Sequence, residues 1–263
     1  MPLVYAAVLP HTPLLVPAIG KEKRDAFTNT LSAYSKVREH LASHKIENVI
    51  ILAPHAQETK PFFQIQHSIT YKASFEEFGD LVTTKNYRVN HVFIDYLKHY
   101  FEGTNIPWVY HTDEQAEYAA TVPLLSLEID RKIPITIIYP PTSSDLSALY
   151  RTGISLYDAI ASHHANIAII GSADLAHTLS KDAPGGFQKN AKAFDQRIVS
   201  AFEKKQFDAL LTTPECTVDE VKTCSMPILA MLSGILKNLP YEHHTLSYEA
   251  PLGVGHLVME FTI

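Results

Sequence analysis

Three short apolar runs in this chain are each followed, within a few residues, by a histidine. The runs cover residues 4–9, 48–52 and 167–170, and the histidines are His11, His55 and His177. Continuous apolar runs bounded by proline or glycine are typical of parallel strands that are buried on both faces. Ligands of such sheets bind beyond the carboxyl ends of the strands. The pattern therefore predicts an α/β fold in which three imidazoles meet at one edge of the sheet.

A histidine at the end of a single strand is usually a hydrogen-bonded residue that caps the sheet. Three histidines in matching positions favour a shared site instead. Neutral imidazole is a ligand for iron, zinc and copper, and it titrates close to neutral pH, so that it can also move protons. We therefore expect a metal site with a base beside it.

Helical and strand patterns alternate along the whole chain. Further strands are predicted at 64–71, 107–110 and 133–139 and in the last 20 or so residues, and helices are predicted at 21–44, 88–101, 119–129, 145–163, 189–203 and 226–236. No repeat, low-complexity linker or glycine-rich phosphate-binding loop interrupts this alternation. The sequence predicts a single three-layer α/β/α domain over residues 1–263, with a central mixed, mostly parallel sheet.

Composition and charge argue against several classes of partner. The net charge is −6 and the pI is near 6.1, and no basic stripe runs along the chain, so we expect no nucleic-acid partner. The first residues lack the basic segment and long apolar run of a signal peptide or membrane span, so we expect a cytoplasmic protein with no membrane contact. The two cysteines, Cys216 and Cys224, are then expected to be thiols.

Four motifs together resemble those of a known family. They are VLPHTPLLVPAIG near the start, IILAPHA, GSADLAH and the terminal LSYEAPLGVG, and they occur in this order over nearly the whole chain. Each motif is short, and it is their order that makes the match specific. The chain resembles the class III extradiol ring-cleavage dioxygenase superfamily, in particular the branch that holds its B-like subunits and the Memo-like proteins.

This resemblance implies a non-heme Fe(II) site held by His11 and His55, at which O2 and a small aromatic substrate with two adjacent oxygens bind. It also implies that His177 is the acid–base residue, with Asp174 orienting it or capping the turn. A hydrolase triad of Ser172, Asp174 and His177 is not expected, because the three lie too close along one turn and no GxSxG elbow is present.

The third metal ligand is where the sequence departs from its ring-cleaving relatives. Those relatives place a glutamate or histidine before the last apolar helix, whereas Memo-like members place a cysteine, and this chain has Cys224 there. A thiolate is a softer ligand, which suits zinc or copper as well as Fe(II). Cys224 also fits a small buried residue at a helix start. Glu220 and Glu249 are alternative carboxylate ligands, and Glu249 is the better placed because it is expected in a loop.

A second departure concerns the residue that would contact substrate or oxygen. Ring-cleaving relatives tend to read Asp-His-Gly where this chain has Glu117, Tyr118 and Ala119. Tyr118 therefore replaces a histidine, and its phenol can still donate a hydrogen bond. Tyr118 also fits an ordinary core aromatic, and His111 is a second candidate for the gap. The walls of an aromatic pocket are expected among Tyr5, Phe62, Phe63, Tyr118 and Tyr139.

Three functions remain open from the sequence. The first is an Fe(II) dioxygenase of the extradiol type that acts on a catechol-like aromatic. The second is a Memo-like protein that binds a metal or a partner without ring cleavage, a branch that the resemblance associates with a radical-SAM system. The third is a zinc hydrolase with the same ligands. The sequence leaves open whether the chain forms a homodimer or pairs with a second subunit.

Overall fold

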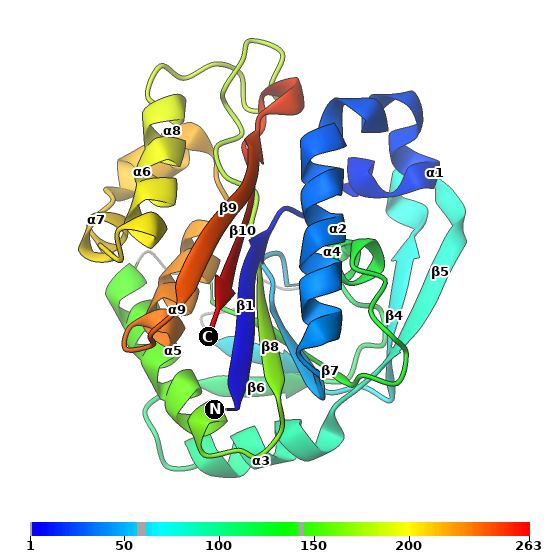
Figure 1. The fold of residues 1–263 in the computed structure, drawn as a ribbon, viewed down its shortest axis with the longest axis vertical. Coiled ribbons are helices and arrows are strands. Elements are labelled where there is room, and N and C mark those ends of the chain that lie inside the picture. The colour runs from blue at the N-terminus through cyan, green and yellow to red at the C-terminus, as the bar shows by residue number, and fades with distance from the viewer. Residues whose placement is uncertain (1, 57–61, 142–144) are drawn as a thin grey trace.

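The centre of the molecule is an eight-stranded sheet (Figure 1). The structure is a computed structural model and describes residues 2–56, 62–141 and 145–263. The strand order is β6-β3-β7-β2-β8-β1-β10-β9; the central strands β7, β2, β8 and β1 run parallel, and β3 and β10 join them antiparallel. The strands are β1 (Leu3–Leu9), β2 (Asn48–Leu52), β3 (Phe63–Gln66), β6 (Trp108–His111), β7 (Ile135–Tyr139), β8 (Ile167–Ser172), β9 (Glu242–Glu249) and β10 (His256–Thr262).

The central strands lie in the middle of the sheet because they are apolar along almost their whole length. β2 reads NVIIL, β7 reads ITIIY and β8 reads IAIIGS, and every residue of these three strands is buried. Strands of this kind need cover on both faces, which only an interior position provides. The prediction of a mixed, mostly parallel sheet is confirmed.

Helices cover both faces of this sheet. In Figure 1, α2 lies on one side of β1, and α5 and α9 lie on the other. α2 contacts β1, β9 and β10, whereas α9 contacts β8, so the predicted three layers are confirmed. Within the described residues, no helix combines the length and apolar character needed to cross a bilayer. The helices are α1 (Pro17–Gly20), α2 (Thr28–Ser43), α3 (His91–Phe101), α4 (Tyr118–Ser126), α5 (Leu146–Ala161), α6 (Ala191–Glu203), α7 (Asp208–Leu211), α8 (Glu215–Val221) and α9 (Met226–Leu236).

Two glycines allow α5 and α9 to pack in close contact. A Cβ added at Gly153 would lie 2.0 Å from the carbonyl oxygen of Met231, and one added at Gly234 would lie 2.0 Å from that of Tyr150. A residue with a side chain at either position would force the helices apart. Because α9 begins two residues after Cys224, this contact helps to hold Cys224 in place.

A separate two-stranded sheet is formed by β4 (Thr70–Phe75) and β5 (Asp80–Arg88). The sequence pattern predicts one strand over residues 64–71, which is wrong, because the chain divides these residues between β3 and β4. The pattern gives no sign of β5. The reason is that the neighbours Leu81 and Val82 are both exposed, which breaks the alternation of a half-buried strand.

The carboxyl ends of β1, β8 and β2, which are neighbours in the sheet, carry the residues of chemical interest. His11 follows β1, His55 follows β2, and Asp174 and His177 follow β8. The segment before α9 brings Cys224 to the same edge. The topology of the sheet therefore gathers these side chains at the place where α/β proteins bind ligands.

Candidate metal centre

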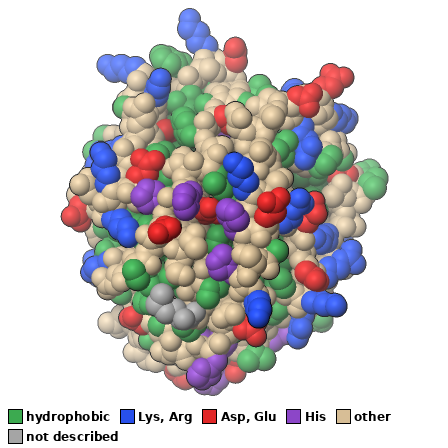
Figure 2. Space-filling view, in the orientation of Figure 1, with side chains coloured by type: hydrophobic (Ala, Val, Ile, Leu, Met, Phe, Trp, Pro, Cys, Tyr) green, Lys and Arg blue, Asp and Glu red, His purple; other side chains and the backbone are tan. Residues whose placement is uncertain are grey.

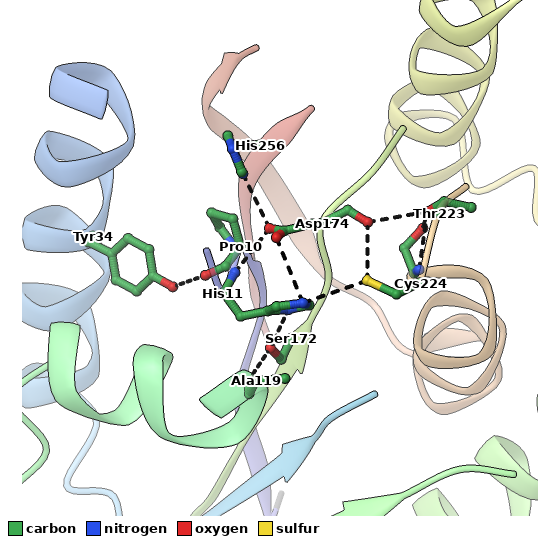
Figure 3. A network of polar contacts seen from close by, with 10 residues as sticks. Pro10, His11, Tyr34, Ala119, Ser172, Asp174, Thr223, Cys224 and His256 are labelled. Carbon is green, nitrogen blue, oxygen red and sulfur yellow. Dashed lines mark hydrogen bonds and ion pairs between the residues drawn. The ribbon is translucent and has the colours of Figure 1, made fainter. Parts of the chain in front are cut away.

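Hydrogen bonds hold His11 through both its backbone and its ring (Figure 3). The backbone N–H donates to Asp174 Oδ1 at 3.0 Å, and ring Nδ1 lies 2.9 Å from Ser172 Oγ. The carbonyl oxygen of the preceding Pro10 accepts from the hydroxyl of Tyr34. His11 is only 1% exposed. Its position at the end of β1 is therefore fixed by the surrounding fold.

The hydroxyl of Ser172 determines which ring nitrogen of His11 carries the proton. Ser172 Oγ lies 2.5 Å from the carbonyl oxygen of Ala119, which can only accept, so the hydroxyl donates there. Ser172 Oγ must then accept from His11 Nδ1–H, and Ser172 forms no triad with His177. The other nitrogen, Nε2, keeps its lone pair and faces Cys224. This is the tautomer of a metal ligand whose second nitrogen is fixed by a hydrogen bond.

His55 reaches the same place through a strained turn. β2 ends at Leu52, and the backbone of His55 has a φ of 62°. This left-handed conformation is uncommon for residues other than glycine, and strain of this kind concentrates at functional sites. The His55 ring lies 5.6 Å from the His11 ring at an interplanar angle of 83°. The side chain of His55 is more exposed than that of His11.

Cys224 completes the group from the segment before α9. Its Sγ lies 3.6 Å from His11 Nε2 and 3.7 Å from the carbonyl oxygen of Asp174. The hydroxyl of the neighbouring Thr223 donates to the same carbonyl at 3.2 Å, which ties this segment to the residues after β8. In Figure 3 the side chains of His11 and Cys224 point toward one another.

The donor atoms of His11, His55 and Cys224 fit a metal ion. One ligand atom from each of the three lies within 4.8 Å of the other two. In a tetrahedral site with bonds of about 2.0–2.3 Å, neighbouring donors lie about 3.5 Å apart. The distance of 3.6 Å between His11 Nε2 and Cys224 Sγ agrees with this spacing. Two imidazoles and a thiol suit iron, zinc or copper.

Burial sets the protonation of these three donors. It lowers the pKa of His11 to about 4, although the charge of Asp174 opposes the shift. It also lowers the pKa of His55, and it raises the pKa of the Cys224 thiol to about 12. At neutral pH both imidazoles therefore have a free lone pair, whereas the thiol has to lose a proton before it can bind a metal.

Asp174 connects the donors to the C-terminal strand. Its Oδ1 accepts from the backbone of His11 and lies 3.2 Å from Nδ1 of the buried His256, and its Oδ2 lies 3.7 Å from His11 Nε2. Burial alone would raise the pKa of Asp174, but the neighbouring histidines, His11 foremost, hold it below its usual range. Asp174 therefore keeps a negative charge beside the donors.

A second buried carboxylate, Asp195 on α6, supports the backbone behind the site. It accepts from the N–H of Ala176 at 2.9 Å and from the hydroxyl of Tyr248 at 2.7 Å. Burial raises the pKa of Asp195 to about 6 despite these bonds. A Cβ at Gly255 would lie 2.1 Å from Asp195 Oδ2. Sequence reasoning missed Asp195, Tyr248 and His256, and the glycine at position 255 is the one signal that another segment approaches closely there.

His177 lines a cavity together with His55 and Cys224. Its backbone N–H donates to Val221 O at 2.9 Å, whereas its buried ring Nε2 has no hydrogen-bond partner among the described residues. Burial lowers the pKa of His177 against the opposing charge of Asp174, so the ring is neutral at pH 7. The oxygens of Asp174 bond elsewhere, so Asp174 acts on His177 through its charge and does not orient it by a hydrogen bond.

This cavity has a volume of about 690 Å³. Such a volume is ordinary for a small-molecule site. The expected aromatic walls are wrong, because none of the five aromatic candidates lines the cavity; Tyr5, for example, is fully buried and donates to Glu260. The apolar wall is formed instead by residues that include Pro54, Pro140, Pro141, Met226, Pro227 and Ile228.

Tyr118, the first residue of α4, packs against both histidine donors. Its ring lies 5.8 Å from His55 in a stacked arrangement and 5.9 Å from His11 at an angle of 65°. Burial raises the pKa of its phenol, which therefore stays neutral and able to donate. The alternative residue, His111, lies on β6 with its Nδ1 3.2 Å from a carboxylate oxygen of Asp113. Of the two, the structure brings Tyr118 to the donors.

The two alternative carboxylates lie outside the donor group. Glu249, expected in a loop, is the last residue of β9, and its oxygens accept from Thr30 N at 2.8 Å and from Asn29 Nδ2 at 3.0 Å. Glu220 is exposed on α8 and accepts from Asn190 at 2.6 Å. The structure therefore does not place Glu249 as a ligand, because its carboxylate is engaged at the start of α2.

Comparisons with known proteins bear on the fold and the family of the chain. Protein CA_C1420 of Clostridium acetobutylicum is 24% identical over 96% of this chain, and the chain spans 56% of that protein's length. The crystal structure of the uncharacterized protein JW3007 from Escherichia coli K12 has the same fold, with a TM-score of 0.65, 13% identity and coverage of 98% of this chain and 99% of that one. The family model of the catalytic LigB subunit of aromatic ring-opening dioxygenase matches residues 5–259, and the chain belongs to this family.

Proposed function

We propose that this protein is a non-heme Fe(II) oxygenase of the extradiol type that acts on a catechol-like aromatic compound. The observation that carries the proposal is the meeting of donor atoms from His11, His55 and Cys224 within 4.8 Å, beside a cavity of about 690 Å³. Membership of the LigB family supports the class of reaction.

Two imidazoles and one thiolate would hold the metal. When bound, Fe(II) supplies neighbouring coordination positions for O2 and for the two adjacent oxygens of a catechol. Zinc and copper also bind well to this donor set, so the residues alone do not select iron. The negative charge of Asp174, 3.7 Å from His11 Nε2, favours a cation at this position.

His177 is suited to take a proton from the bound substrate. A catechol hydroxyl loses its proton on binding, and a neutral imidazole within reach is an effective base for that step. His177 lines the cavity, and its Nε2 has no partner among the described residues. The charge of Asp174 stabilises the imidazolium that forms when His177 accepts the proton.

Tyr118 is suited to position an oxygen atom beside the donors. Its ring packs against His55 and His11, and its phenol stays neutral because burial raises its pKa. A neutral phenol can donate a hydrogen bond to the substrate or to O2. The apolar residues of the cavity wall would exclude water from the cavity, which His55 and Cys224 also line.

A second function, a Memo-like metal-binding protein without ring cleavage, is favoured by one observation. The third donor is the partly buried thiol of Cys224, where ring-cleaving relatives have a carboxylate or imidazole. Such a protein would act through a partner. The partners expected from the sequence are a second copy of the chain, a second subunit or a radical-SAM protein. We place the protein in the cytoplasm in either case, because both cysteines are free.

Fe(II) binding and O2 uptake test both functions. The protein is loaded with Fe(II) under anaerobic conditions beside His11→Ala, Cys224→Ser and a matched control, Cys216→Ser, which changes an exposed thiol. We expect Cys224→Ser to weaken binding by more than about 100-fold, beyond the loss that an outer-shell partner causes, and Cys216→Ser to leave it unchanged.

O2 uptake with a panel of catechols then separates the two functions. Uptake by the wild-type protein that is lost in Cys224→Ser supports the oxygenase. Tight Fe(II) binding through the same residues without any uptake supports the second function. A wild-type protein that binds no Fe(II) contradicts the oxygenase, and one that also binds neither zinc nor copper contradicts the second function as well.

A further inference from the structure

The four most exposed large apolar side chains among the described residues lie in two pairs, one at each end of the β4–β5 hairpin. Val82 is 87% exposed, Ile69 84%, Val92 78% and Leu81 75%, whereas the next, Phe187, is 58% exposed. Figure 2 shows hydrophobic side chains projecting at the margin of the molecule where Figure 1 places β5. Single apolar residues are normal on a surface, whereas a protruding pair at each end of one hairpin points to an interaction site.

The outer edge of β5 pairs with no other strand among the described residues, although at its start the N–H groups of Val82 and Thr83 already donate to Asp80 Oδ1 at 3.0 Å. It pairs with β4 on one side, and the opposite side of β4 is covered by backbone hydrogen bonds of Lys72 with Glu114 and Ala116. Within residues 2–56, 62–141 and 145–263, no strand pairs with the outer side of β5. Unpaired N–H and C=O groups along a strand are a template for another strand, and a sheet of only two strands is marginally stable.

The two ends of β5 have complementary shapes. Leu81 and Val82 protrude at its start, next to the turn of the hairpin. At the other end lies a hollow of about 270 Å³, whose lining includes Ile69, Arg88 and Val92. A protruding apolar pair and a hollow of mixed apolar and polar lining therefore lie at opposite ends of one strand.

The two ends of the hairpin also carry opposite charges. The turn carries Glu76, Glu77 and Asp80, and the opposite end carries Lys72 and Arg88. If two β5 strands pair antiparallel, the acidic end of each lies beside the basic end of the other. Parallel pairing would bring like charges together, which is unfavourable.

We propose that two copies of this chain associate by antiparallel pairing of their β5 strands about a two-fold axis. The pairing joins the two hairpins into one continuous sheet. Leu81 and Val82 of each copy then reach the hollow of the other copy, and each acidic turn lies near the other copy's Arg88. The same surface serves both copies, as in other two-fold interfaces. This association is independent of the metal centre, which lies at the edge of the main sheet.

Sedimentation velocity of the 263-residue chain at about 1–100 µM tests this interface. We expect a concentration-dependent dimer in the wild-type chain. Val82→Glu places a charge in the apolar contact, and Arg88→Glu places like charges together, so each weakens the dimer by more than about tenfold. Leu252→Glu, a change at an exposed apolar residue outside the hairpin, is the matched control and leaves the dimer unchanged.

A charge exchange separates loss of the interface from loss of folding. Glu77→Arg combined with Arg88→Glu restores opposite charges across the two-fold axis, so the double variant dimerises more tightly than Arg88→Glu alone. Three results would overturn the proposal. The first is a wild-type chain that stays monomeric at about 100 µM, which would leave the edge of β5 to a different partner. The others are a dimer that Val82→Glu does not weaken and a double variant that dimerises no more tightly than Arg88→Glu alone.

Discussion

The carboxyl edge of the main sheet has two parts that differ in how fully their polar atoms are bonded. The floor consists of His11, Ser172, Asp174 and His256, which are buried and hydrogen-bonded to one another. The mouth consists of His55 and His177, which face the cavity. In the mouth, His55 has a strained backbone and the ring Nε2 of His177 has no partner among the described residues.

This difference indicates a division of roles. A buried polar network is tolerated only when its members are bonded, so the floor forms as part of the fold and rigidifies it. Strain and an unpartnered buried nitrogen cost stability instead, and they persist where the surrounding structure holds them for a chemical purpose. We therefore expect changes in the floor to affect stability and the placement of the His11 donor, and changes in the mouth to affect turnover.

The largest effect on turnover is expected from His177→Gln, which removes the base of the mouth. Turnover of a catechol should fall by about 10²–10⁴-fold, the usual contribution of a general base. Fe(II) affinity should not change, because the His177 ring nitrogen is not among the grouped donor atoms. An oxygen electrode and an anaerobic Fe(II) titration measure the two quantities. If affinity falls as steeply as turnover, His177 is a ligand and the division of roles is lost.

The next effect is expected in the floor, from Asp174→Asn. This change removes a buried charge that bonds to the backbone of His11 and to His256, and it should lower the free energy of unfolding by about 3 kcal/mol. His177→Gln is the matching change in the mouth, and it should alter the free energy of unfolding by less than about 0.5 kcal/mol. Urea unfolding of the metal-free proteins makes the comparison, and equal losses would contradict it.

The strands that carry both parts could be predicted from the sequence. Buried parallel strands require unbroken apolar runs, and the ends of such strands lie at one edge, so the positions of His11 and His55 follow from local pattern and topology. Cys224 was different. No local pattern distinguishes it from a buried residue at a helix start, and only the order of the motifs singled it out.

The partners of these residues could not be predicted, because they lie far away along the chain. Ser172 is 161 residues from His11, and His256 is 82 residues from Asp174. Periodicity reports on one segment at a time and carries no information on such pairs. Glu249 was misplaced for the same reason, since the residues that bond to its carboxylate lie 219 and 220 residues before it.

A smaller effect, confined to the floor, is expected from Ser172→Ala. Without the hydroxyl, nothing selects the tautomer with a proton on His11 Nδ1, and Fe(II) affinity should fall by about 10–100-fold, as for other outer-shell partners. The nitrogen NMR shifts of the His11 ring provide a second readout. They should show one tautomer in the metal-free wild-type protein and a mixture in the variant, and a single unchanged tautomer in the variant would remove the role of Ser172.

The smallest effect is the dependence of Fe(II) affinity on pH. It tests whether the thiolate of Cys224 binds the metal together with His11 of the floor and His55 of the mouth. In the metal-free chain the Cys224 thiol, with a pKa of about 12, is protonated at neutral pH, whereas His11, with a pKa of about 4, is already neutral. Binding then releases one proton, so affinity should rise about tenfold for each unit between about pH 7 and 9 and fall correspondingly as pH drops. In Cys224→Ala no proton is released, and the weaker affinity should stay nearly constant over this range. Competition titrations against a chelator measure the slope of Fe(II) affinity against pH in the wild-type protein and in Cys224→Ala. Equal slopes would mean that only the imidazoles of His11 and His55 bind the metal.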